Sequence, residues 1–179
     1  MRQNLPVTQL EYVLHDSETI VSKTDLQGNI TYANDAFIRI SGYAETELIG
    51  APQNILRHPD MPAEAFADLW RTIKAGKSWT GLVKNRCKNG DFYWVEATAA
   101  PLSKDAQVIG YTSICVKPSR QQINAAEAAY RAINNGDRRL QVYEGAAIPR
   151  RRWNPLQWHA RLSISTRLMS FVILMALLN

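Results

Sequence analysis

Three consecutive β-strand patterns in the middle of the sequence constrain the fold more than any other feature. The first two, residues 79–88 and 91–102, flank Asn89-Gly90, the dipeptide most typical of a tight β-hairpin. A short polar turn at residues 104–107 leads into a third, largely apolar run at 108–118. Because both connections are too short for a helical crossover, the three strands must pair as an antiparallel meander.

Two further strand patterns precede the meander, at residues 19–24 and 30–34. The turn between them contains Gly28-Asn29, and both residues tolerate the positive φ that such turns require. In the first strand, alternation places Ile20, Ser22 and Thr24 on one face.

Helical patterns separate the first two strands from the last three. Residues 35–51 contain short helical stretches interrupted by glycine, and residues 61–76 form the clearest helix, with apolar residues at helical spacing. This order predicts an α+β fold in which a five-stranded antiparallel sheet carries its helices between strands two and three.

A linker helix is expected directly after Pro118. Ser119 and Gln122 match a capping box, and Gly136 marks the end of the helix. The expected organisation of the whole chain is an N-terminal cap, a main domain, a linker helix with its connector, a basic segment and an apolar segment, at residues 1–18, 19–118, 119–149, 150–167 and 168–179.

The basic character of the chain comes from its C-terminal segment. All 16 acidic residues and all but five of the 21 Lys and Arg lie before residue 150, so that part has no net charge and does not resemble a nucleic-acid-binding domain. Arginines and tryptophans precede the apolar run 168–178, as at a membrane interface. At about 1.5 Å per residue the run reaches about half of a ~30 Å bilayer core. We expect the start of a truncated transmembrane anchor, with residues 1–167 on the cytoplasmic side.

The two cysteines, Cys87 and Cys115, have no CxxC partner. This usage favours a reducing compartment and gives no support to a zinc site.

The sequence Arg57-His58-Pro59-Asp60 is the main candidate for a functional site. Arg57 offers planar donors that suit a pyrophosphate, His58 can donate to a phosphate, ribose or ring edge, and Asp60 is placed to cap the helix that follows. The alternative is a local turn without ligand contacts. A catalytic role is disfavoured because no nucleophile or second acid–base pair lies at a useful spacing.

The motifs TDLQGNITYANDAF and NRCKNGDFYWVEATAAPL, in this order of elements, resemble a PAS domain. RHPDMP followed by AFADLW and GKSWTGLVKNRCKNGDFYWV, before a basic, tryptophan-rich linker, resembles the bacterial aerotaxis receptors. The resemblance implies an FAD-binding redox sensor of the inner membrane that is not an enzyme. It also implies a homodimer that signals to HAMP and kinase-control modules, neither of which is present in these 179 residues.

The resemblance extends the cofactor site beyond the Arg57 cluster. Asn85 matches an asparagine of flavin-binding LOV domains, which are another PAS class, and its amide suits the edge of an isoalloxazine ring. Its alternative is an Asn at a strand edge bonded to water. Trp79 is either a flavin-stacking or an ordinary core tryptophan. Asn34 either contacts the cofactor or caps the helix beginning at residue 35. The expected set of cofactor contacts is Asn34, Arg57, His58, Asp60, Trp70, Trp79, Asn85 and Tyr93.

Other PAS functions remain open at this stage. Some PAS domains bind haem through a histidine, here His58, and others only dimerise. A photochemical cysteinyl adduct is not expected, because the segment 50–58, where LOV photosensors carry their cysteine, has none.

Overall fold

The computed structural model describes residues 4–150. A five-stranded sheet in the order β2-β1-β5-β4-β3 forms its centre, and every neighbouring pair is antiparallel. The strands are β1 (Ile20–Thr24), β2 (Ile30–Ala33), β3 (Trp79–Arg86), β4 (Phe92–Lys104) and β5 (Gln107–Val116).

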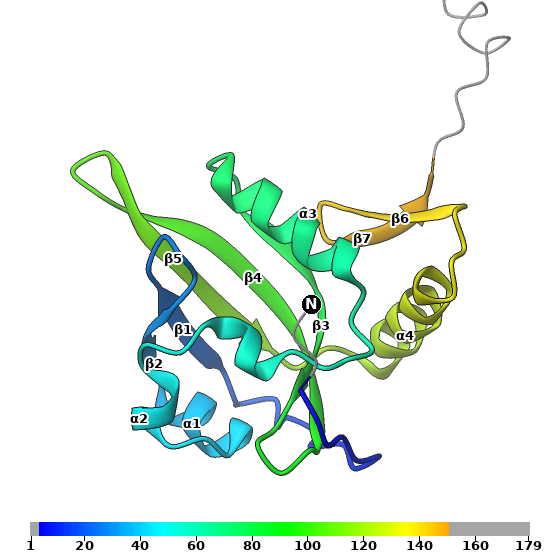
Figure 1. Ribbon diagram of the computed structural model, residues 1–179, viewed down its shortest axis with the longest axis horizontal. Coiled ribbons are helices and arrows are strands. Elements are labelled where there is room, and N and C mark those ends of the chain that lie inside the picture. Colours follow the sequence, from blue (N-terminus) through cyan, green and yellow to red (C-terminus); the bar gives the residue numbers. More distant parts are fainter. Residues whose placement is uncertain (1–3, 151–179) are drawn as a thin grey trace, which may run out of the picture. The chain divides into compact units, whose positions relative to one another are not determined.

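The helices between β2 and β3 are α1 (Asp35–Ser41), α2 (Glu45–Leu48), the 3₁₀ helix η1 (Gln53–Leu56) and α3 (Ala63–Lys74). Figure 1 shows α1 and α2 beside the β1–β2 end of the sheet, and α3 beside β3 and β4. The predicted α+β fold is therefore confirmed.

One face of β4 explains where the core sits. Tyr93, Val95, Ala97 and Ala99 alternate along this strand, and all four are buried. The large side chains of this face lie at one end of the strand and the alanines at the other. The alanines leave space between the sheet and the helices.

The helix α3 begins differently from the expectation. Pro62 occupies its N-cap position, and no side chain caps the helix. The prediction that Asp60 caps α3 is therefore wrong. The Asp60 carboxylate instead accepts a hydrogen bond from the Lys84 ammonium at 2.7 Å. This partner lies in a strand that sequence spacing could not connect to Asp60.

The N-terminal segment is attached more firmly than a loose cap. The Tyr12 N–H donates to the Phe92 carbonyl at 2.7 Å, and the Phe92 N–H donates to the Leu10 carbonyl at 3.0 Å. Leu14 is part of the hydrophobic core. The segment thus extends the hydrogen bonding at the start of β4.

The linker helix forms as predicted, as α4 (Arg120–Asn134), with Ser119 and Gln122 making the capping box. It packs on the main domain. The Tyr130 hydroxyl donates to the Leu82 carbonyl at 2.8 Å, and the Tyr130 ring stacks on the Trp94 ring with centroids 6.4 Å apart. Ile123 and Tyr130 are the buried residues of the helix, so its apolar side faces the main domain.

A hairpin that the sequence analysis did not anticipate follows α4. It consists of β6 (Leu140–Tyr143) and β7 (Ala146–Pro149), and it packs against both α3 and α4 (Figure 1). Its turn is Glu144-Gly145, with φ of 47° and 84°. Glutamate is an unusual residue at positive φ, and Glu144-Gly145 is not one of the Asn-Gly or Asp-Gly dipeptides that indicate such a turn in a sequence. The hairpin therefore could not be predicted from its turn.

No helix within residues 4–150 is long and apolar enough to cross a membrane. Apart from Arg150, the predicted basic segment at 150–167 lies outside the described residues, as does the predicted anchor at 168–179.

Candidate cofactor cavity

A cavity of about 400 Å³ lies between the inner face of the sheet and the helices η1 and α3. Val83, Ala97 and Ala99 line it from the sheet, and Phe66 and Leu69 line it from α3. The volume and the mainly apolar walls are those of a small-molecule or cofactor site.

Uncharged polar side chains lie among these apolar walls. Ser22 and Thr24 line the cavity from β1, Gln53 from η1, and Asn85 from β3. Gln53 Nε2 donates to Ser22 Oγ at 3.3 Å, which satisfies that pair internally. The Asn85 amide makes no hydrogen bond within the described part of the chain, so its donors and acceptor are available to a ligand.

Arg57 is the one charged residue among the described residues that line the cavity. An isolated β-bridge pairs it with Asn85 on the edge strand β3, and its guanidinium lies 4.1 Å from the centre of the Phe66 ring. A guanidinium N–H donates to the Met61 carbonyl at 3.3 Å. Burial lowers the pKa of Arg57, but a guanidinium remains a cation at any physiological pH. A cavity lined by a cation and no acid suits an anionic ligand.

The structure brings together half of the predicted cofactor contacts: Arg57, Trp70, Asn85 and Tyr93 line the cavity. Trp70 meets Tyr111 edge to face, with ring centroids 5.5 Å apart. Tyr93 is almost fully buried, and this burial raises its pKa well above the usual value, so its phenol is neutral.

Asn34 and Trp79 do not line the cavity. The Asn34 side chain accepts hydrogen bonds from the Phe37 and Val21 N–H groups and donates to the Thr19 carbonyl. The bond from Phe37 is the cap of α1 that the alternative predicted, and the other two attach Asn34 to the start of β1. The Trp79 indole is buried and donates to the Asp68 carboxylate at 2.8 Å, as an ordinary core tryptophan does.

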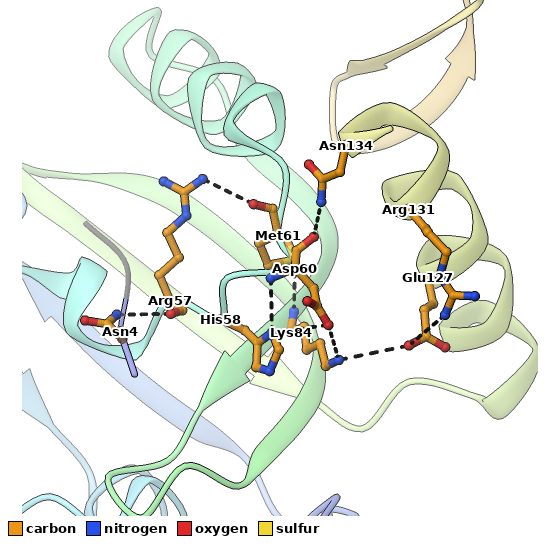
Figure 2. A network of polar contacts seen from close by, with 9 residues as sticks. All are labelled: Asn4, Arg57, His58, Asp60, Met61, Lys84, Glu127, Arg131 and Asn134. Atoms are coloured by element: carbon orange, nitrogen blue, oxygen red, sulfur yellow. Dashed lines mark hydrogen bonds and ion pairs between the residues drawn. The ribbon is translucent and has the colours of Figure 1, made fainter. Parts of the chain in front are cut away.

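His58 is buried outside the cavity, beside β3 (Figure 2). Its Nδ1 accepts a hydrogen bond from the Asp60 N–H at 3.2 Å, which places the proton of the neutral ring on Nε2. Burial, together with the nearby cations Lys84 and Arg86, lowers the pKa of His58 to about 4, although Asp60 opposes this shift. The imidazole is therefore neutral at pH 7.

Asp60 belongs to a polar network that joins the loop before α3 to the linker helix (Figure 2). Its carboxylate is paired with the buried Lys84 ammonium, which also lies 4.0 Å from Glu127 of α4. The Asp60 carbonyl accepts a hydrogen bond from Asn134, at the end of α4, at 2.6 Å. The loop that supplies Arg57 to the cavity is thus fixed to α4.

The profile of the PAS fold matches residues 30–115, the part of the chain that contains this cavity. This part of the chain has the PAS fold. The expected resemblance is also confirmed: the chain is 44% identical over 178 residues to the aerotaxis receptor of Escherichia coli K12, across 96% of this chain and 34% of that receptor. The chain thus spans about a third of the length of this relative.

Two more distant similarities agree with the fold. The chain is 30% identical over 90 residues to a nitrogen fixation regulatory protein of Klebsiella pneumoniae, covering 50% of this chain and 18% of that protein. A solved light-oxygen-voltage domain, studied with a flavin analogue, superposes with a TM-score of 0.53 at 24% identity, over 65% of this chain and 86% of that domain.

Sequence reasoning missed several residues that line the cavity of the PAS domain. Cys115 is the most notable, because its thiol is buried and burial raises its pKa to about 11. Its neutral thiol is a weak nucleophile at pH 7. The alternation of β5 could have placed Cys115 on the inner face, but its register against β1 and β4 is a tertiary property. The same holds for Tyr111 and Ser113.

Proposed function

We propose that this PAS domain binds FAD non-covalently in the cavity and acts as a redox sensor of oxygen and energy state, not as an enzyme. The observation that carries the proposal is the make-up of the cavity. It combines apolar walls, a free amide at Asn85 and a single lining cation at Arg57 within the described chain. The similarity to an aerotaxis receptor supports the same reading.

The shape of the cavity supports a ligand with an extended ring system. Thr24 and Asn85 line it from β1 and β3, which are separated in the sheet by β5 and β4. At about 4.8 Å per strand spacing, the two strands lie roughly 14 Å apart. A gas molecule or small metabolite would not contact both sides.

Each lining group has a specific task in this proposal. The alanines of β4 leave room for a planar ring, and α3 excludes water from its other side. The Asn85 amide bonds the ring edge, and the Arg57 guanidinium bonds the pyrophosphate. Bound FAD supplies reversible electron transfer. Asn85 would hold the ring edge at the point where a change of redox state is felt, and its strand neighbour Lys84 contacts the loop and α4.

The wider assignments also remain proposals. The resemblance to aerotaxis receptors supports a homodimer at the inner membrane, with the PAS domain in the cytoplasm. It also supports output through HAMP and kinase-control modules in a longer protein.

The absorption spectrum of the purified protein, combined with cofactor extraction, tests the proposal. We expect a yellow protein that releases FAD. Release of FMN alone would contradict the pyrophosphate role of Arg57. A haem spectrum would favour the haem alternative, although no histidine of residues 4–150 lines the cavity. A colourless protein that takes up no added FAD would favour a dimerisation module.

A further inference from the structure

Thr24 carries a buried hydroxyl without a hydrogen-bond partner in the described part of the chain. The residue is 5% exposed and lines the cavity from the end of β1. Because a buried polar group without a partner is costly, native proteins rarely keep one unless it serves a purpose. A purely structural role would be met better by valine, which has the same shape and favours strands equally.

The alternation of β1 places the Thr24 side chain on the inner face of the sheet, and the backbone at this position is held on both edges of the strand. The pairing of β1 with β2 shifts register between Lys23 and Thr24, as at a β-bulge. Such irregularities often lie beside functional sites. On the other side, Gly110 of β5 approaches so closely that an added Cβ would lie 2.1 Å from the Thr24 carbonyl. The two contacts fix the end of β1 on both edges.

The remaining polar groups around the cavity do not explain this hydroxyl. Ser22 is paired with Gln53, and the Thr112 hydroxyl donates to the Ser22 carbonyl at 3.4 Å. The other buried side-chain atom without a partner in the described chain, His58 Nε2, belongs to a residue that does not line the cavity. Among residues 4–150, Thr24 is therefore the one residue that combines a fully buried side-chain atom without a partner with a place in the cavity wall; Asn85, whose amide is also unpaired, is only half-buried.

We propose that Thr24 is a cofactor-binding residue, whose hydroxyl forms a hydrogen bond with a polar atom of the bound flavin. It contacts the cofactor from β1, on the same face of the sheet as Asn85 but three strands away from it. The inference rests on the proposed function, because it requires a flavin in this cavity. It adds a contact that the motif around Arg57 does not indicate.

FAD titration of the apoprotein tests the contact, with Thr24→Val and Thr24→Ser compared. Valine keeps the shape and removes the hydroxyl, whereas serine keeps the hydroxyl and removes a methyl group. We expect Thr24→Val to weaken FAD binding about 5- to 50-fold and Thr24→Ser to weaken it less. Thr98→Val is the matched control, since Thr98 is exposed on the other face of β4; its FAD affinity should equal that of the wild type.

The relative FAD affinities of Thr24→Val and Thr24→Ser decide the outcome. If Thr24→Ser binds FAD as weakly as Thr24→Val or more weakly, side-chain packing is what matters and the hydrogen bond is refuted. Equal binding by Thr24→Val and the wild type also refutes it, while leaving the proposed function intact. A wild-type protein that binds no flavin overturns the proposed function, and this contact with it.

Discussion

At the residue scale, a buried neutral imidazole makes the stability of this domain depend on pH. The pKa of His58 falls from an ordinary 6.5 to about 4 in the folded protein. The unfolded chain therefore binds a proton between pH 6.5 and pH 4 that the folded chain does not. The stability that the neutral His58 contributes is fully present above pH 6.5, its pKa in the unfolded chain. This contribution decreases as the pH falls through this window.

We expect the free energy of unfolding to decrease by on the order of 2 kcal/mol between pH 7.5 and pH 5. Denaturant unfolding at several pH values measures this slope. His58→Gln should flatten it, because the side chain no longer titrates. His15→Gln, at an exposed position, should leave it unchanged. A slope that persists in His58→Gln would show that other groups cause it.

Arg57 offers a second test at this scale, because its proposed partner is a single part of the cofactor. Arg57→Ala should weaken FAD binding about 10- to 100-fold, the effect of losing a charged hydrogen bond. Riboflavin, which lacks the pyrophosphate, should bind the variant and the wild type alike. The exposed cation Arg39, paired with Glu18, provides the control Arg39→Ala. An equal loss for FAD and riboflavin would assign Arg57 to the shape of the cavity and not to the pyrophosphate.

At the element scale, α3 has two functional sides. One side lines the cavity through Phe66, Leu69 and Trp70. On the other, the buried Asp68 carboxylate accepts hydrogen bonds from the Trp79 indole, the Arg71 guanidinium, and the N–H groups of Glu144 and Gly145. The helix that covers the cavity thus also holds the hairpin turn through which the chain leaves the domain.

Asp68→Asn should loosen this hairpin. An amide replaces one acceptor oxygen with a donor, so two of the N–H groups around it lose their partner. We expect a loss of about 2–4 kcal/mol in stability and faster hydrogen exchange at the Glu144 and Gly145 amides. Asp105→Asn, in the exposed turn between β4 and β5, should have no comparable effect. Unchanged exchange at the hairpin turn would show that Asp68 does not hold it.

The elements also show what could be predicted from the sequence. Local signals placed the sheet strands, the helix order and α4, because the Asn89-Gly90 turn and the Ser119–Gln122 box act within a few residues. The Asp60 contact was mispredicted because Lys84, its partner, is distant in the sequence. Likewise, no local pattern could tell that His58 lies outside the cavity while its neighbour Arg57 lines it.

At the scale of the whole molecule, residues 1–149 form one compact unit that contains the cavity, α4 and the hairpin. This unit has no net charge, whereas the remaining 30 residues contain five arginines and no acid. Near an anionic membrane surface each cation contributes on the order of 1 kcal/mol. The apolar run from Leu168 to Leu178 has Ser170 as its one polar residue, so it lacks the polar face of an interfacial helix.

Residues up to Pro149 should therefore suffice for cofactor binding, and membrane attachment should require the residues after it. We expect a chain ending there to bind FAD and unfold at the same temperature as the 179-residue chain. In sedimentation with anionic vesicles and no detergent, the longer chain should pellet and the shorter one should remain in the supernatant. Replacing the five arginines by glutamine should weaken the attachment but not the flavin binding, because electrostatic attraction and apolar insertion both contribute. Equal distribution of the two chains would refute the anchor, while loss of flavin from the shorter chain would show that the sensor needs the segment after residue 149.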